Sequence, residues 1–177
     1  MKRIISLLLV LCMCLAVFAG CAKKNDEKAP DGMKKASGNN VDYSMYVPTA
    51  WEVDRNDLFT SAYYPGRTDK TNISATAHAI AGDIATVEDW WKTFENDLSN
   101  ICTEMSKVAV TKARLGGVDG KEFTFTGKNG GTEYNFIITA VIKDFYVYYL
   151  TYTSPTEYNE KHLEERTMIV EAFRFDK

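Results

Sequence analysis

Apolar and aromatic residues concentrate in three consecutive runs between Gly120 and Thr153. The runs are Glu122 to Thr126, Tyr134 to Ile142, and Phe145 to Thr153. The first alternates, the second is almost wholly apolar, and the third carries aromatic residues on both faces, a pattern typical of strands. Lys128-Asn129-Gly130-Gly131 and Lys143-Asp144 supply short turns. The sequence therefore predicts an antiparallel meander whose second and third strands are central.

Shorter patterns before the meander predict more strands and one helix. Strands are expected at Asp42–Val47, Leu58–Tyr64, Ile73–Ile80 and Lys107–Ala113. Thr86 is a plausible N-cap, and apolar residues then recur at spacings of three and four as far as Met105. This helix is amphipathic and should pack on the sheet. The alternate alanines Ala75, Ala77 and Ala79 would let it approach closely.

A second helix is expected after the meander. Ser154-Pro155-Thr156-Glu157 resembles a capping box with proline at the first helical position. Tyr158, His162, Glu165 and Ile169 then share one side of the helix. The chain closes on Ala172-Phe173-Arg174-Phe175, which predicts a short extended tail.

The N-terminus has the features of an export signal. Met1-Lys2-Arg3 is basic, and Ile4 to Phe18 is an apolar run of about fifteen residues, too short for a membrane span. Phe18-Ala19-Gly20-Cys21 resembles the lipobox of bacterial lipoproteins, although that pattern usually has Leu where Phe18 stands. We expect residues 1–20 to be removed and Cys21 to carry lipid. The alternative is ordinary secretory cleavage that leaves Cys21 as a free thiol.

Residues 21–40 are expected to form the lipidated cysteine and a flexible tether, because Ala22 to Asn40 is polar and has no periodic apolar face. The folded domain would then span 41–177. Once Cys12 and Cys14 leave with the signal and Cys21 carries lipid, only Cys102 remains, so no intrachain disulfide can form. Cys102 is expected to be a buried, inert residue on the apolar side of the first helix.

Composition and charge narrow the class of protein. The chain has 177 residues, 45% hydrophobic and 25% charged, which fits one globular domain with an appendage. The net charge is −3, and the first 20 residues contribute two cations and no acid. An acidic mature chain argues against nucleic-acid binding, and membrane attachment must come from lipid rather than from basic residues.

The order of motifs along the chain resembles the PsbP-like family, which includes bacterial DcrB-like lipoproteins. The resemblance rests on Tyr43-Ser44-Met45-Tyr46-Val47-Pro48-Thr49-Ala50-Trp51, the amphipathic helix, the glycine-punctuated meander, and the closing helix with Ala172-Phe173-Arg174-Phe175. It covers about Val41 to Lys177. It implies an α+β fold, an antiparallel sheet flanked by helices in an α/β/α sandwich, and a binding or assembly role without catalytic residues. A photosynthetic role is not implied for this chain.

Candidate chemistry is sparse. His78 and His162 are far apart, with no partners at metal-ligand spacing, so we expect structural or surface histidines and no metal or cofactor. The phosphate-binding loops and nucleophile elbows of known enzymes have no counterpart here. Glu157, Glu160, Glu164 and Glu165 lie near Lys161 and Arg166, which is typical of a solvated helix face.

The binding candidates are aromatic and cationic. The loop from Tyr64 to Lys70 joins two strands, and Arg67 with Tyr63 or Tyr64 could meet a carboxylate or phosphate beside an apolar anchor. Trp90 and Trp91 point about 100° apart on a helix, so one of them could be partly exposed. We therefore expect an exported, membrane-anchored envelope domain that binds a partner, such as an envelope protein, or helps to assemble one, and that is not an enzyme. A small-ligand binder with a pocket between helix and sheet and an unrecognised hydrolase are the alternatives.

Overall fold

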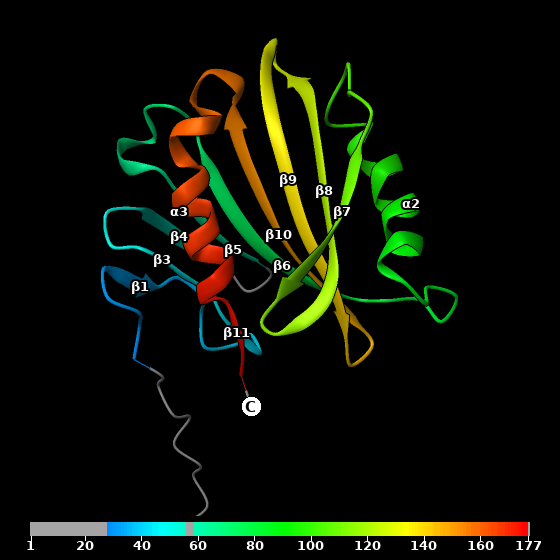
Figure 1. Ribbon diagram of the computed structural model, residues 1–177, viewed down its shortest axis with the longest axis horizontal. Coiled ribbons are helices and arrows are strands. Elements are labelled where there is room, and N and C mark those ends of the chain that lie inside the picture. The colour runs from blue at the N-terminus through cyan, green and yellow to red at the C-terminus, as the bar shows by residue number, and fades with distance from the viewer. Residues whose placement is uncertain (1–27, 56–58, 177) are drawn as a thin grey trace, which may run out of the picture.

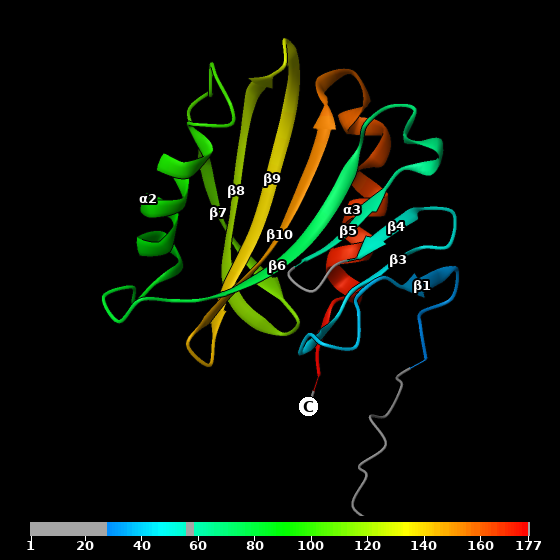
Figure 2. The ribbon, with the colours of Figure 1, turned by 180° about the vertical axis from the view of Figure 1, so that it is seen from behind.

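The computed structural model describes residues 28–55 and 59–176. Its centre is a seven-stranded antiparallel sheet in the order β4-β5-β6-β10-β9-β8-β7 (Figures 1 and 2). The strands are β4 (Glu52–Arg55), β5 (Phe59–Tyr63), β6 (Asn72–Ala79), β7 (Ala109–Leu115), β8 (Val118–Asn129), β9 (Thr132–Lys143) and β10 (Tyr146–Pro155). The sequence pattern missed only β4 among them.

The predicted meander is confirmed as β8, β9 and β10. Strand β10 is the middle strand of the sheet, with β6 on one side and β9 on the other. Gly130 and Gly131 make the first turn with φ of +58° and +81°. The second turn differs from the prediction by one residue: Lys143 pairs with Tyr146, so Asp144 and Phe145 form the turn and Phe145 is not in the strand.

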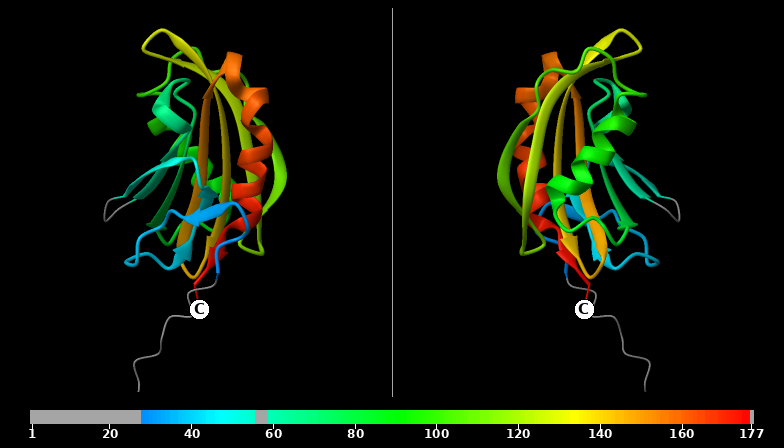
Figure 3. Two further views of the ribbon diagram at one scale, coloured as in Figure 1. Left: turned by 90° about the vertical axis from the view of Figure 1, so that its left-hand side faces the viewer. Right: turned by 90° about the vertical axis from the view of Figure 1, so that its right-hand side faces the viewer.

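Two helices cover opposite faces of this sheet (Figure 3). They are α2 (Val87–Leu98) on one face and α3 (Asn159–Ala172), preceded by a 3-10 turn at Thr156–Tyr158, on the other. Each helix has its own apolar cluster beneath it. The predicted α/β/α sandwich is therefore confirmed.

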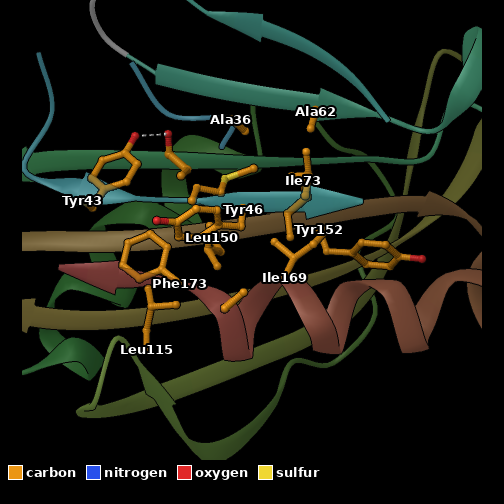
Figure 4. Packing of buried hydrophobic residues seen from close by; sticks show 14 of the residues in the cluster. Ala36, Tyr43, Tyr46, Ala62, Ile73, Leu115, Leu150, Tyr152, Ile169 and Phe173 are labelled. Atoms are coloured by element: carbon orange, nitrogen blue, oxygen red, sulfur yellow. Dashed lines mark hydrogen bonds between the residues drawn. The ribbon is translucent and has the colours of Figure 1, made fainter. Parts of the chain in front are cut away.

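The first core lies between the sheet and α3. It includes Tyr43, Ile73, Leu150, Tyr152 and Ile169, and Figure 4 shows Tyr152 and Ile169 meeting between strand and helix. These five side chains are at most 1% exposed. They form a close-packed aliphatic and aromatic layer, which also contains Trp51 and Phe173.

The second core lies under α2. Trp91 stacks on Phe123 with ring centroids 4.0 Å apart, and Trp90 stacks on Phe94 at 4.6 Å. The alternate alanines of β6 do not belong to it. Ala75 packs in the first core, so the prediction that these alanines face α2 is wrong.

The N-terminal part of the described chain is folded rather than a tether. Strand β1 (Met33–Lys35) pairs with β3 (Tyr46–Pro48), and Met33 and Ala36 are buried in the first core. The folded domain therefore begins near Ala29, which packs against the same core, and not at residue 41. The tether interpretation fails here because strand pairing and the burial of single residues such as Met33 and Ala36, rather than a periodic apolar face, hold the segment. The signal peptide and Cys21 lie outside the described residues.

The strand predicted at Asp42–Val47 is divided into two short strands outside the main sheet. Strand β2 (Tyr43–Ser44) pairs with β11 (Arg174–Phe175), which is the predicted extended tail. Between β2 and β3, the Met45 carbonyl accepts a hydrogen bond from the Ala36 amide at 2.7 Å. The segment thus joins the two ends of the domain.

Helix α2 begins where predicted and ends earlier. Thr86 caps it, its hydroxyl oxygen accepting from the Asp89 amide at 3.1 Å. The helix stops at Leu98, so Ile101 is 64% exposed on a loop. Cys102 is buried as predicted, but in this loop, and burial raises the pKa of its thiol.

Helix α3 begins later than the sequence suggested. Ser154 and Pro155 are the last residues of β10, and the Ser154 hydroxyl lies 2.9 Å from the Thr71 hydroxyl instead of capping a helix. The predicted capping box is therefore wrong. The predicted face is correct, since His162 and Ile169 are both buried.

Candidate binding groove

The connection between β5 and β6 is a short, well-anchored turn. Pro65–Arg67 form a 3-10 turn in which Gly66 and Arg67 have φ of +68° and +51°. The Glu52 carboxylate accepts from the Gly66 amide at 2.9 Å and from Arg67 Nε at 3.4 Å. The Arg67 guanidinium lies 4.0 Å from the centre of the Tyr63 ring, a cation–π contact. These contacts fix the direction of the Arg67 side chain.

A buried charge network holds the other side of this turn. His162 Nε2 lies 2.7 Å from Asp69 Oδ2, and His162 Nδ1 lies 2.7 Å from Glu165 Oε2. Ionised carboxylates only accept hydrogen bonds, so both ring nitrogens donate and His162 is an imidazolium cation. Its side chain is 1% exposed and that of Asp69 is 5% exposed. The network ties the turn to α3.

The carboxyl of Asp69 is kept ionised despite its burial. Desolvation alone would raise its pKa, but the Thr71 amide, which donates to Asp69 Oδ1 at 3.0 Å, and His162 together lower the pKa below its usual range. On the other carboxylate, Trp51 Nε1 donates to Glu165 Oε1 at 3.2 Å. The two buried groups, Asp69 and His162, therefore each have several partners, as buried charges require.

This network corrects two sequence expectations. The turn has no apolar pattern that would predict packing into the core, yet Asp69 is buried and the Tyr64 ring packs on the His162 ring at 4.2 Å between centroids. The acidic face of the last helix was expected to be solvated, yet Glu165 binds His162. Arg166, 12% exposed, pairs with Glu122 of β8. The histidine itself is structural, as predicted.

A groove of about 420 Å³ lies beside the turn, on the α2 face of the sheet. Cross-strand pairing brings its floor together: Asn72 is opposite both Tyr63 and Thr153, and Thr153 is opposite Phe136. Phe136 also packs against the second core, which places the groove on the side of α2. Its lining consists of Tyr63, Arg67, Lys70, Asn72, Asn129, Tyr134, Phe136 and Thr153.

Two exposed cations and three aromatic rings give this groove its chemistry. The Arg67 side chain is 52% exposed, and its partner Glu52 is 49% exposed. The Lys70 ammonium has no hydrogen bond or ion pair within residues 28–55 and 59–176. Tyr134 and Phe136 have ring centroids 6.2 Å apart. Such a surface suits an acidic ligand that also carries apolar or aromatic groups.

The structure separates the candidate binding residues. Tyr63 and Arg67 both line the groove, whereas Tyr64 faces the first core, where it lies edge-on to Trp51 at 6.3 Å. Trp90 and Trp91 are each 6% exposed within the second core. The expectation that one of the two tryptophans is partly exposed is therefore wrong, because the apolar face of α2 is wide enough to bury both.

Sequence reasoning missed the half of the groove that comes from β8 to β10. Asn129, Tyr134 and Thr153 are distant from the turn in sequence and reach it only through strand register. The aromatic residues at positions 134 and 136 were a signal of this half of the groove, because side chains two residues apart in a strand lie on the same face of the sheet.

Two other hollows are weaker candidates for a binding site. A cavity of about 360 Å³ lies between α2 and the sheet, where a small-ligand pocket was considered, and Trp90, Phe94 and Tyr149 line it. These three rings already pack on one another with centroids 4.6 to 5.1 Å apart, which leaves little free ring surface. A larger hollow of about 580 Å³ at the start of α2 is lined by charged side chains that pair among themselves, Lys121 with Glu88 and Arg114 with Asp119.

Neither a metal centre nor a membrane-spanning helix emerges from the described residues. They contain no cluster of three or more His, Cys, Asp or Glu side chains placed to hold a metal ion. No helix within 28–55 or 59–176 is both long and apolar enough to cross a bilayer.

Comparison with solved structures identifies the architecture. The solution structure of cyanobacterial PsbP (CyanoP) from Synechocystis sp. PCC 6803 matches 85% of this chain and 95% of its own, with a TM-score of 0.61 at 12% identity. The fold is PsbP-like. The PsbP-like fold matches the sequence-based resemblance, and at this identity the likeness establishes the fold alone.

Two further structures share the PsbP-like fold. LpqN of Mycobacterium tuberculosis, described as involved in cell envelope biogenesis, covers 76% of this chain and 83% of its own (TM-score 0.56, 14% identity). The Ran-binding protein Mog1p of Saccharomyces cerevisiae covers 81% and 95% (TM-score 0.56, 11% identity). No protein-family model and no curated protein sequence matches the chain. A fold shared this widely does not determine function, so function must come from the site.

Proposed function

We propose that this protein is a lipid-anchored domain of the bacterial cell envelope that binds a protein partner through the groove beside Arg67 and is not an enzyme. The observation that carries the proposal is the convergence of Arg67 and Lys70 with Tyr63, Tyr134 and Phe136 around one open groove. The description of LpqN as involved in cell envelope biogenesis supports a role in the envelope, and that of Mog1p as a Ran-binding protein supports protein binding by this fold.

The arrangement around His162 supports a non-catalytic role. Both ring nitrogens are occupied by carboxylates, so neither is free to accept a proton from a hydroxyl nucleophile. The ring is 1% exposed and is not part of the groove lining. A hydrolase built on this histidine would need both an open nitrogen and access for substrate.

The expected partner carries an acidic segment with an apolar or aromatic residue. A carboxylate from the partner would compete with Glu52 for the Arg67 guanidinium, and Lys70 would pair with a second acid. The rings of Tyr134 and Phe136 would receive the apolar residue. The groove is open and partly polar, as expected for an interface that forms and dissociates.

Lipid attachment at Cys21 is the first testable consequence. The lipobox-like Phe18-Ala19-Gly20-Cys21 predicts cleavage before Cys21 and a mature chain that begins with lipid-modified Cys21. Mass spectrometry of the mature protein should show that modification, and Cys21→Ala should remain unprocessed or enter the soluble fraction. A mature chain that starts elsewhere, or with an unmodified cysteine, would refute the anchor.

The groove is tested by removing its cations. The double variant Arg67→Ala/Lys70→Ala should lose the captured envelope partner, with binding weakened about tenfold or more, because exposed arginines at interface centres carry much of the affinity. Its unfolding free energy should stay within about 0.5 kcal/mol of the parent, as for other surface changes. Affinity capture from the envelope, followed by quantitation of each bound protein, gives the result.

Lys107→Ala provides the matched control, since Lys107 is an exposed lysine away from the groove. It should leave capture unchanged. If the double variant retains every partner of the parent, the groove is not the binding surface and the proposal is wrong.

A further inference from the structure

The turn between β9 and β10 has an unusual residue for its geometry. Asp144 and Phe145 have φ of +49° and +65°, the left-handed conformation that a two-residue hairpin turn requires. Glycine or asparagine normally takes such positions, and a bulky side chain there is an outlier. The Phe145 ring is 84% exposed, and the next residue, Tyr146, is 44% exposed.

The fold itself does not account for the Phe145 side chain. The Phe145 carbonyl accepts a hydrogen bond from the Ile80 amide at 3.0 Å, a contact that any residue could provide. Backbone strain and an apolar ring in water are both unfavourable, and such features tend to mark functional positions. The neighbouring charges of Lys143 and Asp144 pair with each other, so the ring stands beside a neutralised pair.

The turn lies at the end of the domain where the described chain begins. Figures 1 and 3 place the start of the coloured chain, strand β11 and the β9–β10 turn at the same end. The groove is at the other end, because it involves the first residues of β9 and the last residues of β10. Strand β10 has ten residues, so the two ends are about 30 Å apart.

The corrected domain boundary brings this end close to the anchor. Ala29, where core packing begins, lies eight positions after Cys21 in the sequence. A step of eight positions can reach at most about 28 Å, the length of a fully extended chain. A domain anchored by lipid on Cys21, as the proposed function requires, is therefore held with this end near the bilayer surface.

We propose that Phe145, with Tyr146 beside it, inserts into the headgroup region of the bilayer and orients the domain with its groove facing away from the membrane. Aromatic rings favour this interface, where an apolar body meets polar headgroups. One ring binds lipid weakly by itself, but the anchor raises its effective concentration at the surface, so the turn determines orientation rather than attachment. The attraction is apolar, so it requires no anionic lipid and little salt dependence is expected.

The test uses the full lipidated protein purified in detergent and reconstituted in vesicles of zwitterionic phosphatidylcholine. Phe145→Cys is labelled with a polarity-sensitive fluorophore; buried Cys102 stays unlabelled in the native state, as the parent protein must show. Ile101→Cys is the matched control, because Ile101 is also an exposed apolar residue, 64% exposed, on the loop between α2 and β7 at the opposite end (Figure 1).

The label at position 145 should show blue-shifted emission and several-fold stronger quenching by headgroup-region nitroxide lipids than the label at 101. The result should be the same in 0.1 M and 0.5 M salt, within about a tenth of the signal. Mass spectrometry of each preparation reports lipid on Cys21 independently.

The outcomes distinguish the inference from the proposed anchor. Lipidated protein with equal, weak quenching at both positions refutes membrane insertion and leaves the anchor standing. Protein without lipid on Cys21 refutes the anchor, and the inference fails with it. Protection of position 145 in native envelopes but not in pure lipid vesicles would assign Phe145 to a protein contact and overturn the proposal.

Discussion

His162→Leu is expected to lower the unfolding free energy by about 3–5 kcal/mol, because it removes the cation between two carboxylates and leaves Asp69 charged and buried. The Asp69 side chain is 5% exposed and has His162 Nε2 at 2.7 Å, so water cannot replace the lost partner without local opening. Urea unfolding of the mature protein measures the change. At a slope of about 1–3 kcal/mol per molar urea, the midpoint should fall by 1 M or more.

Two variants control for this result. Lys161→Ala removes a cation 3.7 Å from the same carboxylate, but the Lys161 side chain is 55% exposed, so the cost should be about 1 kcal/mol or less. In an Asp69→Asn background, His162→Leu should cost clearly less than in the parent, since no buried charge remains on that side. Strictly additive effects of the two substitutions would contradict a coupled network.

The same network predicts the direction of acid sensitivity. The folded-state pKa of Asp69 lies below its value in the unfolded chain, so the folded state binds fewer protons there. The stability that this carboxylate contributes is present above its unfolded pKa of 3.8 and is lost as the pH falls through its lower folded-state pKa.

The sequence correctly predicted the elements whose structure depends on residues close together in the chain. The meander was correct because strand alternation and Gly130-Gly131 are local signals. The start of α2 was correct because Thr86 bonds to the Asp89 amide three residues away. The same logic placed Tyr63 and Arg67 where a strand ends in a polar turn, and both line the candidate groove.

The errors come from interactions between distant residues. The apolar spacing continues past Leu98, yet the helix ends at that residue. Cys102 instead packs on β8, so closely that a side-chain carbon added at Gly127 would lie 2.1 Å from the Cys102 sulfur. Asp69 and His162 are 93 residues apart, and only the fold brings a turn aspartate to a helix histidine. Strand β1 is held by backbone pairing with β3, which side-chain composition does not reveal.

Trp91→Ala should also cost about 3–5 kcal/mol, which tests whether the tryptophans of α2 are core residues and not binding anchors. The Trp91 ring lies parallel to Phe123 within 6° at 4.0 Å and is 6% exposed, so its removal opens a large void under the helix. Thermal and urea unfolding would show the loss. Capture of the envelope partner at a temperature where the variant stays folded should be unchanged.

Ile101→Ser is the matched control, because the sequence pattern places Ile101 on the same apolar helix face as Trp91, whereas the structure exposes it on a loop. Its replacement should change the unfolding free energy by about 0.5 kcal/mol or less. Trp91→Phe, which keeps a ring against Phe123, should fall between the two. Removal of a side chain that contributes to the core must lower stability. A Trp91→Ala protein that is as stable as the parent but loses its partner would therefore contradict the core position of Trp91 and assign α2 to the interface.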